Sequence, residues 1–273
     1  MTIQFQQLHP ALQFVVAIAL LYLVLCLLAL VVARPMMFPA PASSYDDSYP
    51  TVTLRTKDGL AVAGIFLENS EAKFTLLFSH GNGEDIGYAQ EFLEELRDLG
   101  FNVFAYDYPG YGLSEGTPSE DSCNEAIFAA YHYLVEERNI APSTIVVHGR
   151  SLGGAPSVEL ASRHPVGGVI LESSFVSAFR VMTKVTFFPF DRFRNLEKIP
   201  KINCPSLIIH GERDEVVPFW HGQRLHQLAP EPKTFLPLSD ASHNDVRYVG
   251  GTTYFNAIRS FADSLPVSKE NSP

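Results

Sequence analysis

Ser151 stands between glycines in a Gly-Arg-Ser-Leu-Gly pattern at residues 149–153. The β-branched run at 145–147 predicts a buried strand before it, and residues 158–160 predict the start of a helix behind it. The serine therefore falls in a strand-to-helix turn, where small neighbours leave room for the backbone angles that lift its hydroxyl above a sheet. This spacing predicts a nucleophilic serine.

Two later loops supply the groups that such a serine needs. A hydroxyl becomes a nucleophile when an imidazole takes its proton and a carboxylate orients that imidazole. Asp214 follows the apolar run at 206–211, and His243 follows the run at 233–238. Nucleophile, acid and base, in this order and each behind a strand, form the chain order expected of an α/β-hydrolase fold. We therefore predict Ser151, Asp214 and His243 as a catalytic triad.

Two other acids compete with Asp214. Glu172 also stands at the end of a predicted strand, and Asp240 lies close to His243 in the sequence. Asp214 ranks first because it follows the penultimate strand and precedes a helix. The remaining histidines are less well placed as the base, because they lie on or beside predicted helices, next to glycines at strand ends, or before the apolar segment: His9, His80, His132, His148, His164, His210, His221 and His226.

Short strands alternate with helical segments over residues 51–265, before a short tail at 266–273. Besides the Ser151 unit, strands are predicted at 52–55, 61–66, 74–79, 102–106, 167–172, 206–211 and 233–238, and helices near 87–98, 117–138, 219–228 and 253–264. This alternation predicts one α/β domain, with a mostly parallel sheet and helices on both faces. In such a sheet the reacting groups gather at the carboxyl ends of the strands.

The chain begins with an apolar segment. The first 33 residues carry no charged side chain, and residues 11–33 are apolar apart from Gln13. As a helix this stretch would extend about 34 Å, which matches a hydrocarbon core of roughly 30 Å. We predict a retained transmembrane anchor at 11–33, followed by a linker at 34–50 rich in Pro, Ser and Asp. A cleaved signal peptide is the alternative, but the basic segment typical of one is missing.

Positive charge flanks only one side of this segment. Arg34, Arg55 and Lys57 follow it, and no Lys or Arg precedes it. The positive-inside tendency then predicts a single-pass membrane protein with a cytoplasmic hydrolase domain.

The composition excludes several classes of protein. The net charge is -10 and no basic face is visible, so nucleic acid is not expected as a partner. Three cysteines are too few for a disulfide framework, and free thiols are favoured over a bridge between Cys123 and Cys204. No HExxH, paired CxxC or phosphate loop is present, so neither a metal nor a cofactor is expected.

Five motifs, in order, carry a resemblance to a known family: "FSHGNGED", "DYPGYGLSEG", "HGRSLGG", "LIIHGERDEVVP" and "ASHND". Over about residues 50–265 the chain resembles the membrane-associated α/β-hydrolase-domain proteins, serine hydrolases that include acyl-protein thioesterases acting on palmitoylated proteins. The resemblance implies the triad predicted above and an oxyanion hole formed by the backbone N–H groups of Leu152 and Asn82. The depalmitoylating members are held at membranes by an acylated, cysteine-rich amino terminus, in place of which this chain has its apolar segment.

An insertion at about 173–200 favours a lipophilic substrate. It holds six phenylalanines and follows a late strand, where such hydrolases carry a cap: Phe175, Phe179, Phe187, Phe188, Phe190 and Phe193. These rings either cover the sheet or form an acyl pocket. We expect a carboxylic ester or thioester of a lipophilic acyl group to be hydrolysed through an acyl-enzyme. A serine aminopeptidase-like hydrolase, or a non-catalytic binding scaffold of the same fold, is the alternative.

Overall fold

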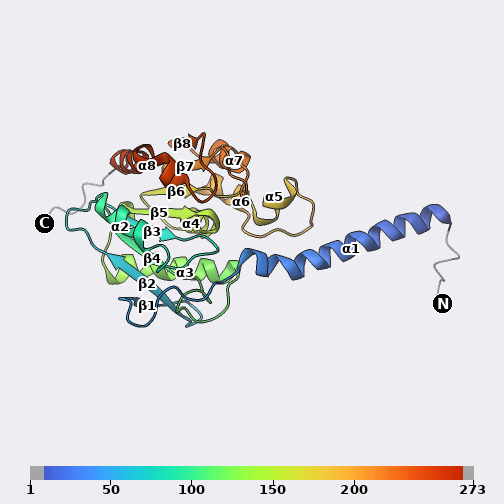
Figure 1. Ribbon diagram of the computed structural model, residues 1–273, viewed down its shortest axis with the longest axis horizontal. Helices are drawn as coiled ribbons and strands as arrows, with labels where there is room; N and C mark the ends of the chain where they lie inside the picture. Colours follow the sequence, from blue (N-terminus) through green and yellow to red (C-terminus); the bar gives the residue numbers. More distant parts are fainter. Residues whose placement is uncertain (1–8, 267–273) are drawn as a thin grey trace. The chain divides into compact units, whose positions relative to one another are not determined.

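The computed structural model describes residues 9–266, and the chain divides into two compact units, with the boundary in the sequence between Pro39 and Ala40. The first unit contains one helix, α1, and every other element belongs to the second unit (Figure 1). All but the first residue of the tail predicted at 266–273 lies outside the described residues.

Helix α1 extends over Pro10–Met37. Proline at the first helical position suits a helix start, because the N–H that it lacks has no partner there. The helix continues to Met37 rather than ending at residue 33, so the first four residues of the predicted linker are helical. By length and composition α1 is a candidate membrane span, although a signal sequence near the amino terminus has the same properties.

The second unit is built on an eight-stranded sheet with the strand order β1-β2-β4-β3-β5-β6-β7-β8. Strand β2 pairs antiparallel with β1 and with β4, and all other neighbours are parallel. The central strands are buried apart from Arg150 at the end of β5, as expected of strands covered on both faces. The strands are β1 Val52–Arg55, β2 Ala61–Leu67, β3 Thr75–Ser79, β4 Asn102–Tyr106, β5 Ile145–Arg150, β6 Gly168–Glu172, β7 Ser206–Gly211 and β8 Lys233–Leu238.

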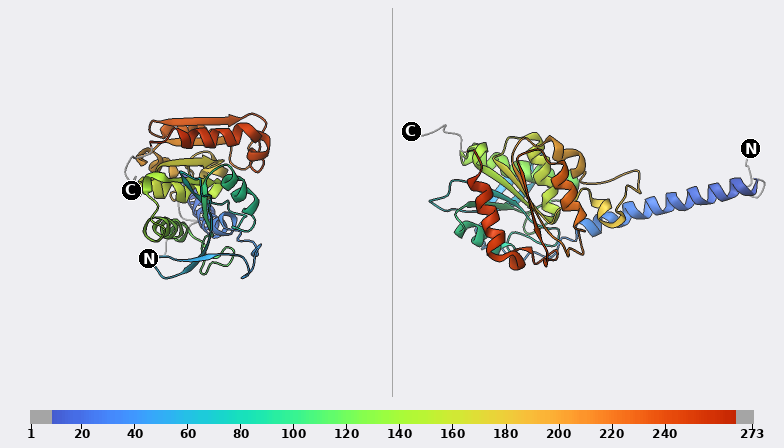
Figure 2. Two further views of the ribbon diagram at one scale, coloured as in Figure 1. Left: turned by 90° about the vertical axis from the view of Figure 1, so that its left-hand side faces the viewer. Right: turned by 90° about the horizontal axis from the view of Figure 1, so that it is seen from above.

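Helices cover both faces of this sheet (Figure 2). On one face, α2 and α8 contribute Leu93 and Ile258 to an apolar cluster with the strands. On the other face, α4 and α7 contribute Val158 and Leu225 to a second cluster. The helices are α2 Gln90–Asp98, α3 Glu120–His132, α4 Gly154–Arg163, α5 Ala178–Thr183, α6 Asn195–Lys198, α7 Trp220–Leu228 and α8 Val246–Asp263.

Two helical segments differ from the prediction. Helix α3 begins at Glu120, behind a capping box at Ser119, rather than at residue 117 as predicted. Its α-helical part ends at His132, and a π-helical turn, Tyr133–Glu137, continues it nearly to the predicted end. Helix α8 begins at Val246, seven residues before the predicted start, and has a kink at Gly251, where φ is 46°. The two adjacent glycines suggest a break in the sequence, but the chain turns there and remains helical on both sides.

Candidate active site

Ser151 occupies a strained turn at the carboxyl end of β5. Its φ is 52°, in the left-handed region that costs a residue with a Cβ about 1–2 kcal/mol. A 3-10 turn, Ser151–Gly153, leads directly into α4. A Cβ at Gly149 would lie 2.4 Å from the carbonyl oxygen of Gly153, and a Cβ at Gly153 would lie 2.0 Å from the carbonyl oxygen of Ser79. Only glycine fits either position, because Gly149 packs against the turn itself and Gly153 packs against the end of β3.

The structure brings Ser151, His243 and Asp214 into one hydrogen-bonded line. His243 Nε2 lies 2.9 Å from Ser151 Oγ, and its Nδ1 lies 2.7 Å from Asp214 Oδ2. Because a carboxylate only accepts, Nδ1 carries the proton and donates it to Asp214, which leaves Nε2 to accept from the Ser151 hydroxyl. This tautomer is the one in which the imidazole can act as a base toward the serine.

Asp214 is held in a fixed orientation by its neighbours. Its Oδ1 accepts backbone N–H groups from Val216 at 3.0 Å and Val217 at 2.6 Å, while His210 Nε2 lies 3.3 Å from Oδ2. Burial alone would raise the pKa of this carboxyl, but the hydrogen bonds from His210 and His243 outweigh burial and hold the pKa well below its usual range. The acid therefore stays ionised at neutral pH.

The two competing acids have other partners. Glu172 is buried at the end of β6, where its Oε2 lies 3.3 Å from His148 Nε2 and accepts from the Tyr254 hydroxyl at 2.5 Å. Asp240 is exposed and pairs with Arg213 at 2.7 Å. Of the three acids, Asp214 is the carboxylate that contacts His243.

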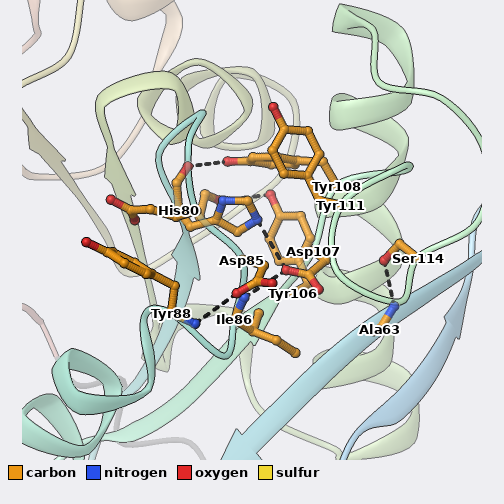
Figure 3. Close-up of polar contacts among 12 residues, drawn as sticks. Ala63, His80, Asp85, Ile86, Tyr88, Tyr106, Asp107, Tyr108, Tyr111 and Ser114 are labelled. Carbon is orange, nitrogen blue, oxygen red and sulfur yellow. Dashed lines mark hydrogen bonds and ion pairs between the residues drawn. The ribbon is translucent and has the colours of Figure 1, made fainter. Parts of the chain in front are cut away.

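The two predicted oxyanion donors flank the serine. Leu152 follows Ser151 in the turn and is buried, and Asn82, in the loop after β3, lines one cleft together with Ser151. Two tyrosines of the "DYPGYG" motif fix this loop: the Tyr108 hydroxyl donates to the His80 carbonyl at 2.7 Å, and the Tyr111 hydroxyl donates to the Asn82 carbonyl at 2.9 Å. Figure 3 shows Tyr108 directed at the loop.

A cleft of about 700 Å³ opens beside Ser151 and His243. Charged side chains contribute much of its lining, which no motif in the sequence predicts. Its lining residues are Gly81, Asn82, Gly83, Glu84, Tyr88, Glu91, Phe92, Arg150, Ser151, Glu172, Val216, His243, Asn244, Arg247 and Tyr248.

Two arginines of the cleft lining are paired with carboxylates. Arg150 lies 2.9 Å from Glu84 and 3.7 Å from Glu172. Burial lowers the pKa of its guanidinium, but these carboxylates outweigh burial and raise it. Arg247, on the first turn of α8, lies 2.6 Å from Glu91 and 2.7 Å from Glu95 of α2. Three carboxylates and two guanidinium groups therefore line the cleft, whose net charge is negative when His243 is neutral.

The phenylalanines of the insertion are absent from this lining. Phe179, Phe187, Phe188 and Phe190 instead pack on one another. The insertion also exposes apolar side chains, with Phe187 at 47% of its full exposure. The rings thus form a separate apolar cluster in the cap rather than a wall of the cleft.

The other expectations concern cysteines and metals. Cys26, Cys123 and Cys204 are free thiols. Burial raises the pKa of the Cys204 thiol to about 12. Within residues 9–266 no group of three or more His, Cys, Asp and Glu side chains is arranged to hold a metal ion.

The sheet order, the turn at Ser151 and the loops that follow β3, β7 and β8 define an α/β hydrolase. Residues 70–193 match the family model "Serine aminopeptidase, S33". The human alpha/beta hydrolase domain-containing protein 17B is 40% identical over 232 residues, which cover 83% of this chain and 80% of that protein. The Caenorhabditis elegans alpha/beta hydrolase domain-containing protein aho-3 is 42% identical over 193 residues, which cover 70% of this chain and 58% of that protein.

A solved structure supports the fold independently. An esterase from Pyrococcus furiosus superposes with a TM-score of 0.71 at 19% identity, covering 84% of this chain and 98% of the esterase. The chain belongs to the α/β-hydrolase family, with the alpha/beta hydrolase domain-containing 17 proteins among its relatives. The predicted family and fold class are confirmed.

Proposed function

We propose that this hydrolase cleaves carboxylic esters or thioesters through an acyl-enzyme on Ser151. The observation that carries the proposal is the line from the Ser151 hydroxyl through His243 to the ionised Asp214, open to a cleft of about 700 Å³. Each group has the tautomer or charge that nucleophilic catalysis requires.

The reaction follows from this geometry. His243 Nε2 takes the hydroxyl proton while Ser151 Oγ attacks the acyl carbon, and the oxyanion that forms accepts hydrogen bonds from the N–H groups of Leu152 and Asn82. The imidazolium, stabilised by Asp214, then protonates the leaving alcohol or thiol. Water attacks the acyl-enzyme with the same base, and the acid product leaves. A preset donor of this kind contributes typically about 3 kcal/mol to the transition state.

A lipophilic acyl group is the substrate that the cap and the apolar amino-terminal helix favour. Because the cap phenylalanines do not line the cleft, the support comes from the exposed apolar surface of the insertion, which includes Met182, Val185 and Phe187. A series of p-nitrophenyl esters tests this part. We expect kcat/KM to rise from acetyl to octanoyl and longer acyl groups, and a preference for acetyl would contradict it.

A serine aminopeptidase-like activity is the second candidate. Glu84, Glu91 and Glu172 line the cleft and give it the negative charge that would suit the free ammonium group of a peptide. Hydrolysis of aminoacyl p-nitroanilides faster than of esters would favour it.

Membrane attachment forms the last part of the proposal. Helix α1 anchors the enzyme as a single span, and the hydrolase domain faces the cytoplasm, since basic residues follow the helix and none precedes it. Protease protection in sealed vesicles tests the orientation: digestion of the domain only from the non-cytoplasmic side would overturn it.

One experiment tests the catalytic core of the proposal. A fluorophosphonate probe should label the wild-type chain and fail to label Ser151→Ala, because the probe phosphonylates an activated serine. A panel of long-chain thioesters, monoacylglycerols and short esters then identifies the substrate class. A folded wild-type sample without labelling would favour a binding scaffold.

A further inference from the structure

The loop that carries Asn82 rests on two buried carboxylates. Asp107, fully buried, accepts the Ile86 N–H at 2.8 Å, and the ring of His80 lies 3.4 Å from the same oxygen. Asp85, also buried, accepts the Tyr88 N–H at 2.8 Å. Figure 3 shows the N–H groups of Ile86 and Tyr88 directed at Asp107 and Asp85, of which Asp85 belongs to the loop itself. The backbone of this loop is therefore held at several points by these two side chains.

Each carboxylate has a second partner from far upstream in the sequence. The Tyr45 hydroxyl donates to Asp107 Oδ2 and accepts the Leu113 N–H at 3.2 Å. Ser44 donates both its backbone N–H, at 2.7 Å, and its hydroxyl to Asp85. Residues 43–49, which we call the strap, thus bind the two carboxylates that hold the loop, although their composition predicts a linker between the apolar segment and the domain.

The fit of the strap is close as well as polar. A Cβ at Gly112, where φ is 51°, would lie 1.9 Å from Asp107 Oδ2 and 2.5 Å from the Tyr45 hydroxyl. A Cβ at Gly87 would lie 2.6 Å from the Ser44 hydroxyl oxygen. Two glycines therefore leave the space in which the strap meets the loop. Burial, and then Asp107, raises the pKa of Tyr45 far above its usual value, so its hydroxyl remains a donor.

We propose that Tyr45 is a positioning residue of the active site: through Asp107 it fixes the loop that presents the Asn82 N–H to the oxyanion. The inference rests on the proposed function, because it assigns Tyr45 an effect on the transition state of that reaction. Loss of the hydroxyl leaves a buried carboxylate short of one donor and allows the loop to shift. A small displacement of a catalytic group is enough to slow a reaction by an order of magnitude.

The chain offers a matched control. Tyr49 belongs to the same strap, its ring lies 5.0 Å from the ring of Tyr45, and its hydroxyl has no hydrogen-bond partner among the described residues. Tyr45→Phe and Tyr49→Phe therefore each remove one strap hydroxyl, but only the first removes a bond to Asp107. A general effect of the strap on stability would appear in both variants.

The test uses the full chain in detergent or nanodiscs, with an ester substrate, fluorophosphonate labelling and amide hydrogen exchange of residues 80–88. For Tyr45→Phe we expect kcat to fall about ten-fold with KM within about two-fold, labelling to slow similarly, and exchange in the loop to accelerate. Tyr49→Phe should match wild type in all three. An unchanged kcat, a change in KM alone, or a slower reaction without faster exchange would each overturn the inference.

A second variant retains the Tyr45 hydroxyl but shifts its position. Gly87→Ala displaces Ser44 and Tyr45 without altering either side chain, and we expect it to lower kcat as Tyr45→Phe does. The kcat of the double variant should be only slightly lower than that of either single variant, because both substitutions act through one contact. If the two fold-losses in kcat multiplied instead, the two substitutions would act independently and the inference would be wrong. If wild type shows neither turnover nor labelling that depends on Ser151, the proposed function fails, while the exchange data still test the contact.

Discussion

Replacing Asp214 by asparagine tests which ring nitrogen of His243 must carry the proton. The two backbone N–H groups of Val216 and Val217 require an acceptor at the position of Oδ1, so the amide oxygen must lie there and the NH2 group must take the place of Oδ2. That NH2 group then faces His243 Nδ1, formerly 2.7 Å from a carboxylate oxygen. The imidazole must accept at Nδ1 and carry its proton on Nε2, toward Ser151. In this tautomer it cannot take the serine proton.

The expected loss follows from this exchange of tautomers. A triad with the wrong tautomer and intact geometry loses about 10⁴-fold in kcat, or about 5 kcal/mol of transition-state stabilisation. Steady-state hydrolysis of a p-nitrophenyl ester measures it, and circular dichroism shows whether the variant is folded. Glu172→Gln serves as the comparison, because its carboxylate contacts His148 and Tyr254 rather than His243. If Asp214→Asn kept near-normal turnover while folded Glu172→Gln lost it, our assignment of the acid would be wrong.

Three further predictions concern stability. Gly153→Ala places a Cβ 2.0 Å from the Ser79 carbonyl oxygen and should cost about 1–3 kcal/mol, read as a lower melting temperature, along with most of the activity. Leu93→Ala, at a fully buried position on α2, should lower the free energy of unfolding by about 2–5 kcal/mol in urea denaturation. Burial, with help from His210 and Arg180, lowers the pKa of His221 to about 3. Below about pH 6.5 the unfolded chain therefore binds a proton at His221 that the folded chain does not bind. The free energy of unfolding should decrease as the pH is lowered from about 6.5 to about 3, and it should decrease less steeply in His221→Asn.

The line formed by Ser151, His243 and Asp214 was predictable because each residue follows a strand of one parallel sheet. Strand ends on the same edge meet whatever the details of packing, so chain order alone brings the three side chains near one another. The two glycines of the motif were predictable for a similar reason, since a sharp turn that packs against itself and against a neighbouring strand leaves no space for a Cβ.

The charged lining of the cleft was not predictable in this way. Arg247 reaches Glu91 and Glu95 only because α8 begins at Val246 and lies beside α2, and the sequence pattern predicts a start seven residues later. Arg150 stands inside the motif, but nothing in the sequence indicates that two glutamates from other elements surround it. Such contacts depend on how helices, strands and loops pack on one another, which periodicity does not encode.

The role of the strap was hidden by composition. Residues 34–50 carry the prolines, serines and aspartates typical of a linker, and the buried carboxylates that bind Tyr45 and Ser44 stand in loops, where aspartate is common. The quoted "DYPGYG" motif was the available signal, because it contains Asp107 together with Tyr108 and Tyr111, which hold the Asn82 loop. No pattern in the sequence connects that motif to Tyr45.

The strap also changes where the hydrolase domain should be cut for work in solution. A fragment that starts at Thr51, the boundary suggested by the strand pattern, would lack Ser44 and Tyr45 and would leave Asp85 and Asp107 without those donors. The compact unit begins at Ala40, so a soluble enzyme made without the apolar helix should keep residues 40–50. Weak activity in a fragment that starts at Thr51 would then reflect the missing strap rather than a poor choice of substrate.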